Sequence, residues 1–233
     1  MNIQIIKTIH IEAARKVMVG ADGKESYTGN RYRIDLVAEG AIDESVGWVV
    51  DYAELKGLFE PVRRFLDHHC LSDVPGLETD SSPGALEIWI NEKLRPWPVW
   101  FRGVRVFPPE PTGFILKYLP AEPESNLPER HMFLFAAAQS LPHLPEGHPC
   151  RFVHGHTYQL EFACRDTVAA PVLAESLYNQ LNGRYLNSIG GLEQSTAERI
   201  ALWVWRHFER SAAGPVLVGV QETPDNKCYY FGD

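Results

Sequence analysis

Alternating apolar and polar residues predict a half-buried strand in each half of the chain. Residues 33–37 (Arg-Ile-Asp-Leu-Val) and 159–162 (Gln-Leu-Glu-Phe) alternate with a period of two. This period places successive side chains on opposite faces of a strand. Short apolar runs predict four further strands, at residues 104–107, 114–118, 216–220 and 228–231.

Four stretches carry apolar residues at steps of three and four, the spacing of an amphipathic helix. In the first half these positions are Tyr52, Leu55, Phe59, Val62 and Leu66, and then Ile88, Trp89 and Leu94. In the second half they are Val172, Leu173, Leu177 and Leu181, and then Ile200, Trp203, Val204 and Phe208. Each half therefore predicts two strands, two helices and two strands. This is an α+β pattern, a four-stranded antiparallel sheet with two helices on one face.

Three blocks of sequence recur in the same order, which indicates an internal duplication. They are 11–15 with 135–139, 28–32 with 154–158, and 71–78 with 186–193. The offset falls from 126 residues in the second block to 115 in the third, so the first half carries about eleven extra residues, around 47–51. We therefore expect two tandem copies, residues 1–120 and 128–233. A Pro- and Glu-rich linker over residues 121–127 would join them.

Composition narrows the class of protein. The chain has 22 Lys and Arg against 30 Asp and Glu, a formal net charge of −8, which argues against general nucleic-acid binding but leaves room for an anionic substrate in a local pocket. No apolar run approaches the ~20 residues of a membrane span, and the first residues do not resemble a secretory signal. Four cysteines without a Cys-x-x-Cys pair do not form a disulfide scaffold, so we expect a reducing cytoplasm.

The sharpest chemical signal is His154-Gly155-His156 on a predicted strand. Side chains at i and i+2 share one face of a strand, so two imidazoles can point at one metal ion, and zinc favours histidine nitrogen. The alternative is two surface histidines that coincide. Cys150, His143 and His148 lie close in sequence and favour a metal or thiol site.

Other polar residues allow two interpretations each. The Asp67-His68-His69 run ends a predicted helix, where it serves either helix-end electrostatics or proton transfer. Cys150 is either an inert buried residue or a nucleophile. Glu222 follows a buried strand and is either a solvated carboxylate or an acceptor for hydrogen bonds from a nitrogen heterocycle.

These motifs resemble the 6-pyruvoyl-tetrahydropterin synthase / 6-carboxy-tetrahydropterin synthase family, once per copy over nearly the whole chain. The resemblance rests on five segments: Phe135-Ala136-Ala137-Ala138, Pro145-Glu146-Gly147-His148-Pro149-Cys150, His154-Gly155-His156, Asp67-His68-His69 and Glu222-Thr223. Residues 47–56 also match the family's pattern before its first helix. The family has the tunnelling fold (T-fold) and assembles as rings. The spacing from Cys150 to His156 is similar to that of the carboxy-forming branch, which belongs to the queuosine pathway.

The resemblance implies a role for each site residue. Zinc would be held by His154, His156 and a third residue after the Phe-x-Ala-Ala block. It would act on 7,8-dihydroneopterin triphosphate. Cys150 would be the proton-transfer base, assisted by an Asp67-His68 pair that the family takes from a neighbouring subunit. Glu222, followed by Thr223, would anchor the pterin ring. The products of the carboxy branch are 6-carboxy-tetrahydropterin, acetaldehyde and triphosphate.

The two copies depart from the family in complementary ways. Copy one has Arg15, Thr28 and Asn30 where the family has its metal histidines, and Pro108 about where the pterin glutamate stands. Copy two has the segment Asn182-Gly183-Arg184 in place of Asp67-His68-His69. We therefore expect a composite site in which copy one supplies the Asp-His pair and copy two supplies metal, thiol and pterin anchor. The sequence leaves open whether the two meet within one chain or between chains.

One departure concerns the metal itself. Gln139 stands where the family has its first zinc histidine, and glutamine is a poor zinc ligand. The third ligand is then Gln139, His143, His148 or water. Two other functions remain open, a non-catalytic pterin-binding relative and a pyruvoyl-forming or aldolase-like enzyme. Six family domains at two per chain predict a homotrimer, with a dimer as the alternative. Arg151 and Lys227 are candidates for binding the triphosphate.

Overall fold

The computed structural model describes residues 3–19, 23–109, 113–211 and 213–232. The first half contains β1 (Ile3–Val19), β2 (Lys24–Gly40), α1 (Tyr52–Leu66), α2 (Pro83–Lys93) and β3 (Phe101–Phe107). The second half contains β4 (Lys117–Leu119), β5 (Arg130–Gln139), β6 (His154–Cys164), α3 (Ala170–Leu181), β7 (Arg184–Tyr185), α4 (Ala197–Arg210), β8 (Pro215–Thr223) and β9 (Asn226–Tyr230). No helix of the described segments is long and apolar enough to cross a membrane.

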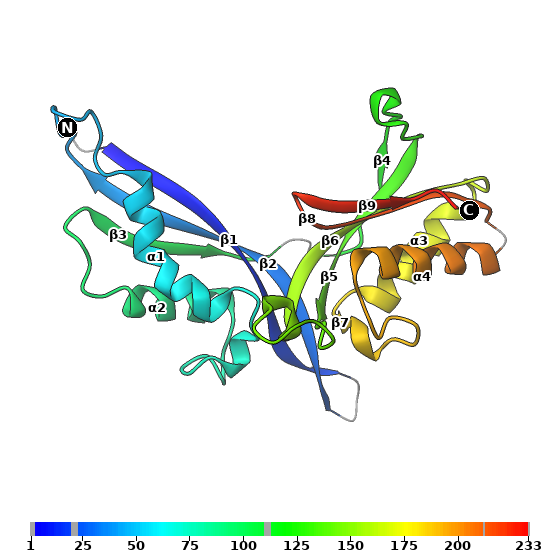
Figure 1. Cartoon of the computed structure of the whole chain (residues 1–233), viewed down its shortest axis with the longest axis horizontal. Helices are drawn as coiled ribbons and strands as arrows, with labels where there is room; N and C mark the ends of the chain where they lie inside the picture. The colour runs from blue at the N-terminus through cyan, green and yellow to red at the C-terminus, as the bar shows by residue number, and fades with distance from the viewer. Residues whose placement is uncertain (1–2, 20–22, 110–112, 212, 233) are drawn as a thin grey trace.

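The strands form two separate sheets. The first has the antiparallel order β1-β2-β3, and the second has the order β4-β5-β6-β8-β9, with β7 pairing parallel to β5. Each sheet carries its pair of helices on one face, and the sheets diverge from the place where the long β1–β2 hairpin meets β5 and β6 (Figure 1). The α+β class with helices on one face of each sheet is as predicted.

One predicted strand pairs elsewhere than expected. The run at 114–118 was expected to complete the first sheet, but the strand there is β4, which pairs with β5 of the second sheet through Lys117 and Met132. Among the described residues the first sheet therefore has three strands. Pro108 and Pro109 follow β3 directly, and proline lacks the N–H group that a continuing ladder needs. The division of the copies at residues 121–127, which include the short 3-10 helix Pro123–Ser125, stays a prediction.

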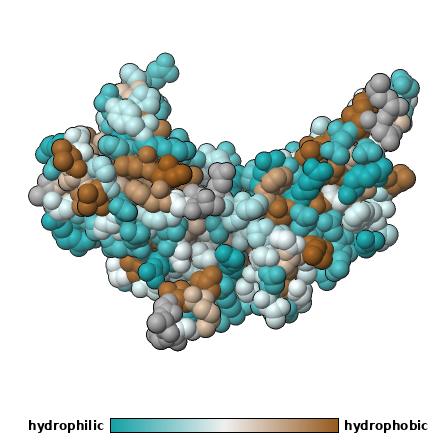
Figure 2. All heavy atoms as spheres, turned by 180° about the vertical axis from the view of Figure 1, so that it is seen from behind, coloured by the Kyte–Doolittle hydropathy of each residue, from teal (hydrophilic) through white to brown (hydrophobic). Residues whose placement is uncertain are grey.

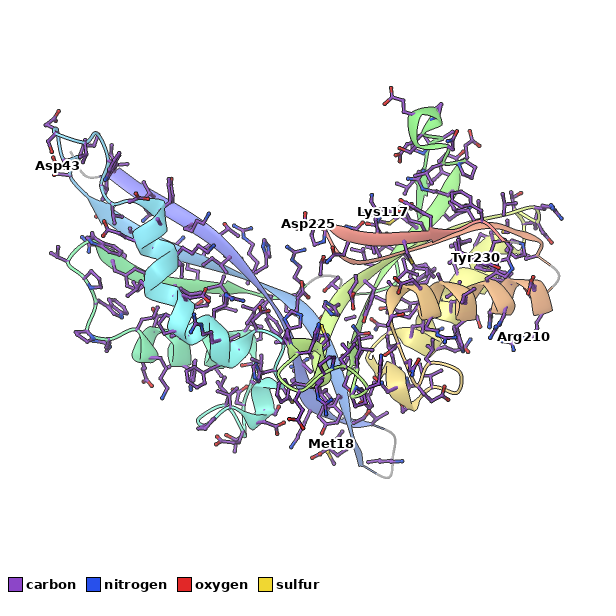
Figure 3. The ribbon with its side chains drawn as sticks, in the orientation of Figure 1. Met18, Asp43, Lys117, Arg210, Asp225 and Tyr230 are labelled. Atoms are coloured by element: carbon purple, nitrogen blue, oxygen red, sulfur yellow. The ribbon has the colours of Figure 1, made fainter. Side chains whose placement is uncertain are left out.

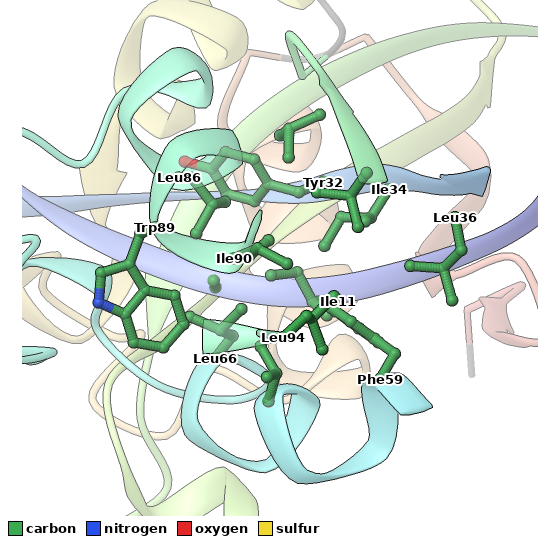
Figure 4. Close-up of a cluster of buried hydrophobic side chains, with 14 of the residues drawn as sticks. Ile11, Tyr32, Ile34, Leu36, Phe59, Leu66, Leu86, Trp89, Ile90 and Leu94 are labelled. Atoms are coloured by element: carbon green, nitrogen blue, oxygen red, sulfur yellow. The ribbon is translucent and has the colours of Figure 1, made fainter. Parts of the chain in front are cut away.

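Each half has its own hydrophobic core between sheet and helices. In the first, Ile11, Tyr32 and Phe59 are almost fully buried and pack with residues of α2 (Figure 4). Not every apolar position of the predicted helices is buried, because Tyr52, Ile88 and Val172 are all more than half exposed. Tyr52 and Val172 lie in the first turn of their helices, before the residues that pack against the sheet.

The extra residues of the first half lie at the end of the first sheet that is farthest from the second half. Asp43 marks this end in Figure 3, remote from Tyr230 in the second half. Apolar side chains are exposed there, among them Ile42, Val46 and Trp48. Figure 2 shows the molecule from behind, with apolar patches among the polar surface of both halves. This segment is therefore distant from the place where the two halves meet.

The two halves meet through a backbone contact at Gly29 and Gly155. A Cβ atom placed on Gly155 would lie 2.0 Å from the Cα atom of Gly29, and one placed on Gly29 would lie 2.2 Å from Gly155. These glycines occupy equivalent positions in the repeated blocks. Nearby, the backbone N–H of Arg31 donates to the Thr157 hydroxyl over 3.2 Å. Because a residue faces its own counterpart, the two copies are related here by an approximate two-fold axis.

Candidate active site

His154 and His156 lie on the same face of β6, as the i and i+2 spacing predicted. Both are buried, at 0% and 2% exposure, and their ring centroids are 5.0 Å apart. Gln139 is the cross-strand partner of His154 on β5. Copy one repeats this register with Arg15 opposite Thr28, so it has no imidazole at the equivalent positions.

His68 reaches this pair from the other copy. It follows α1, adopts a left-handed conformation with φ of 60°, and donates its backbone N–H to the Glu12 carbonyl over 2.7 Å. Its ring centroid lies 4.8 Å from that of His154 and 6.0 Å from that of His156. One ligand atom from each of the three histidines lies within 4.8 Å of the others. Residues of both copies therefore meet within one chain.

Asp67, His68 and Cys150 lie next to one another. His68 Nδ1 is 3.2 Å from Asp67 Oδ1, and the Cys150 side chain lies close enough to His68 to interact with its ring. Asp67 is held in turn by Arg63 and by the Glu12 N–H, the latter over 3.0 Å. Burial alone would lower the pKa of His68, but the bonds to Asp67 and Cys150 outweigh it and raise the pKa to about 10. A histidine between a carboxylate and a thiol can carry a proton between them.

His156 lies between two carboxylates. Its Nδ1 is 3.0 Å from Glu12 Oε2 and its Nε2 is 3.2 Å from Glu222 Oε1. Burial opposes a charge on this ring, yet the two carboxylates raise its pKa to about 9. For His154, burial and then the neighbouring His156 lower the pKa to about 3, so that ring is neutral near pH 7. A metal ion would take the place of the His156 proton, because histidine binds metal only when neutral.

Gln139 and Glu222 complete the wall of the site. Gln139 donates through Nε2 to Glu222, while its Oε1 is buried without a hydrogen-bond partner. Burial would raise the pKa of Glu222, but hydrogen bonding to His156 holds it below its usual value. An unpartnered buried amide oxygen is costly, so a cation beside Gln139 would satisfy it. Two buried imidazoles with a third within reach are donors that fit zinc, and the Gln139 oxygen would add a weaker one.

The other sequence candidates make contacts outside the group of three histidines. His143 and His148 are not part of the group of three histidines, and His148 Nδ1 instead accepts from the Cys150 backbone N–H over 3.2 Å. The Arg151 guanidinium donates to the Leu144 carbonyl. Lys227 lies over the Tyr229 ring, 5.9 Å from its centroid.

The family model for 6-pyruvoyl tetrahydropterin synthase matches residues 4–108 and again residues 130–233. The chain belongs to the 6-pyruvoyl tetrahydropterin synthase family. Two matches in tandem agree with the duplication read from the repeated blocks, and the α+β T-fold of the family is the fold of each half. The chain is thus a tetrahydropterin synthase-like protein of a lyase family.

The two relatives found by sequence each match less than half of this chain. A 6-carboxy-5,6,7,8-tetrahydropterin synthase of Synechocystis sp. is 34% identical over an alignment of 116 positions that covers 42% of this chain and 88% of the relative. A dihydroneopterin monophosphate aldolase of Pyrococcus furiosus is 28% identical over 95 residues, 41% of this chain and 77% of the relative. The solved 6-pyruvoyl tetrahydropterin synthase of Caenorhabditis elegans aligns over 100% of this chain and 97% of its own at 13% identity, with a TM-score of 0.33.

A cleft of about 890 Å³ lies between the two sheets, on the face of β6 opposite to His154 and His156. Its lining includes Thr223, Arg31 and Arg33. Thr223, predicted beside Glu222 at the pterin, thus lines the cleft and not the histidine cluster. The two arginines are already engaged, since Arg33 pairs with Asp35 and Arg31 Nε lies 3.7 Å from Glu12.

Sequence reasoning missed Glu12 as part of the site. The signal was present, because Glu12 is the charged residue in a block that reads Phe135-Ala136-Ala137-Ala138 in the second copy. Its exposure is only 7%. A buried charge needs a partner, and the partner is a histidine of the other copy.

Proposed function

We propose that the chain is a 6-carboxy-5,6,7,8-tetrahydropterin synthase-like lyase. It would convert 7,8-dihydroneopterin triphosphate and water to 6-carboxy-tetrahydropterin, acetaldehyde and triphosphate, a step of deazapurine (queuosine) synthesis. One observation carries the proposal: the Asp67-His68 pair of copy one lies against Cys150 and the His154–His156 pair of copy two. The Cys150-to-His156 spacing and the similarity to the Synechocystis synthase favour the carboxy-forming reaction.

The side chains divide the chemistry among them. Zinc on His154 and His156 would polarise the hydroxyl-bearing side chain of the substrate. Cys150 would accept a proton from that side chain, assisted by the neighbouring His68, while Asp67 holds the imidazole by its Nδ1. The Glu222 carboxylate, which now contacts Gln139 and His156, would accept hydrogen bonds from the N–H groups of the pterin ring. Thr223 would contribute to the pterin site only through its main chain, because its side chain lines the cleft.

For the third zinc ligand we propose Gln139, because it is the cross-strand partner of His154 and its Oε1 is buried without a hydrogen-bond partner. Its Nε2 lies 3.5 Å from His154 Nε2, so the amide group would turn to present Oε1 to the metal. His68 is the second candidate, since its ring lies within reach of the other two histidines. Zinc affinity separates them. If Gln139 is the ligand, Gln139→Ala weakens zinc binding while His68→Ala leaves it and abolishes turnover. The reverse pattern of zinc loss would assign the ligand role to His68.

The test of the function is turnover with product identification. Protein purified without chelator or added metal is analysed for zinc, then incubated with 7,8-dihydroneopterin triphosphate, and the products are identified by mass spectrometry. About one zinc per chain with 6-carboxy-tetrahydropterin and acetaldehyde supports the proposal. Pterin binding without turnover would indicate a non-catalytic relative. A different side-chain product would indicate pyruvoyl-forming or aldolase-like chemistry, which the similarity to the Pyrococcus aldolase also favours.

We further propose that three chains assemble into a homotrimer of six T-fold domains. The first sheet ends in β1 and β3 and the second in β4 and β9, and exposed sheet edges are available for pairing with another chain. Light scattering that gives a monomer mass would refute this assembly. A reducing compartment such as the cytoplasm suits the four cysteines, which are all free.

A further inference from the structure

Glu12 belongs to the first copy, but its carboxylate serves a histidine of the second. His156 Nδ1 donates to Glu12 Oε2 over 3.0 Å, and this is the contact that joins the two buried side chains across the interface between copies. Arg31 Nε lies 3.7 Å from the other carboxylate oxygen. The Glu12 carboxylate is therefore hydrogen-bonded to His156 and has a longer ionic contact with Arg31.

The backbone of Glu12 holds the second half of the composite site. Its carbonyl accepts from the His68 N–H over 2.7 Å, and its N–H donates to Asp67 Oδ1 over 3.0 Å. One residue thus contacts the proposed proton relay through its main chain and a proposed metal ligand through its side chain.

The duplication separates these two contributions. At the equivalent place in copy two, the Ala136 carbonyl accepts from the Gly183 N–H over 2.7 Å, and the Ala136 N–H donates to Asn182 Oδ1 over 2.9 Å. The backbone contacts are therefore common to both copies and need no carboxylate. The carboxylate occurs only in the copy that faces His156, whereas the counterpart of His156 in copy one is Asn30.

The chemistry of an imidazole explains what the carboxylate does. When Nδ1 carries a proton that is donated to a carboxylate, the neutral ring keeps its lone pair on Nε2, the nitrogen that faces Glu222 and the histidine cluster. A carboxylate on the far nitrogen of a ligating histidine fixes the tautomer and the ring orientation and makes the ligand more basic. Burying a carboxylate is costly unless it is paired, so the charge at position 12 is explained by this contact.

We propose that Glu12 is a positioning residue for His156, so that copy one orients a metal ligand of copy two in addition to supplying the Asp-His pair. This inference rests on the proposed function only in taking His156 as a metal ligand. It predicts that the loss of the Glu12 carboxylate weakens zinc binding directly, without any change in the residues that touch the metal.

The experiment measures zinc affinity in full-length variants by competition with a chromophoric chelator. Glu12→Ala should weaken zinc binding about 10- to 100-fold. Glu12→Gln keeps an acceptor for His156 Nδ1 and should recover part of that loss. The matched control is Asp35→Asn, since Asp35 is also a buried carboxylate of the β1–β2 hairpin and pairs with Arg33 instead of a histidine. It should leave zinc affinity unchanged.

Each outcome distinguishes the inference from its alternatives. Zinc affinity within two-fold of the unmodified protein in Glu12→Ala would overturn it, as would an equal loss in Asp35→Asn, which would show general loosening. If Glu12→Ala does not fold, Glu12→Gln decides, because its side chain has the same shape without the charge. A Glu12→Gln protein that binds zinc as tightly as the unmodified protein would also overturn the inference. Absence of zinc binding by the unmodified chain would instead refute the proposed metal site.

Discussion

Substituting Gly155 by alanine tests whether the contact between the two copies holds the site together. The new Cβ would lie 2.0 Å from Gly29 Cα, about 1.5 Å short of a carbon–carbon contact of ~3.5 Å. The obstacle is backbone on both sides and cannot rotate away. Overpacking of this kind costs about 1–3 kcal/mol, and we expect Gly155→Ala to lie near 3 kcal/mol.

To relieve this contact the two copies would have to move apart. This would move His68 of copy one away from His154 of copy two, so zinc binding and turnover should fall together with stability. Denaturant unfolding gives the free-energy change, and chelator competition gives the zinc affinity. Gly57→Ala in α1 is the control, because no atom lies within 4 Å of its added Cβ and alanine in a helix stabilises by about 0.5–1 kcal/mol over glycine. A Gly155→Ala protein as stable as the parent, with unchanged zinc affinity, would refute the reasoning.

Three further predictions concern the described residues. Phe59→Ala should lower the free energy of unfolding by about 3–5 kcal/mol, because the ring is fully buried; calorimetry checks this. Arg130→Met should cost about 3–5 kcal/mol in denaturant unfolding, because it leaves the buried carboxylate of Glu161 without its charged partner, and Glu161→Gln in the same chain should restore part of the loss. Burial would raise the pKa of Asp35, but Arg33 holds it below its usual value. The stability from this pair is therefore present above the unfolded pKa of about 4 and is lost as the pH falls through the folded pKa; unfolding of the parent protein measured against Asp35→Asn between pH 7 and pH 2 should show this convergence.

Local sequence was sufficient for the elements and for the residue pairs that lie on one element. The helices at 52–66 and 197–210 follow from apolar steps of three and four, and the shared face of His154 and His156 follows from the period of a strand. The duplication was also visible, because repeated blocks preserve their order. The helices and the shared strand face depend on residues that are close in the sequence, and the duplication depends only on the order of the blocks. All of these can be read from the sequence without knowing the packing.

The tertiary structure alone decided which distant residues meet. The segment at 117–119 joins the second sheet, and the Glu12 carboxylate lies against His156. The composite site of His68 with the histidines of copy two was expected, but only the structure brings them together within one chain. Each of these contacts depends on how the two copies dock at Gly29 and Gly155, and many dockings are compatible with one pattern of apolar residues. The charge of His156 likewise depends on burial between two carboxylates that are 144 and 66 residues away in sequence. The sequence determined the parts of the site, and the packing of one copy against the other determined their arrangement.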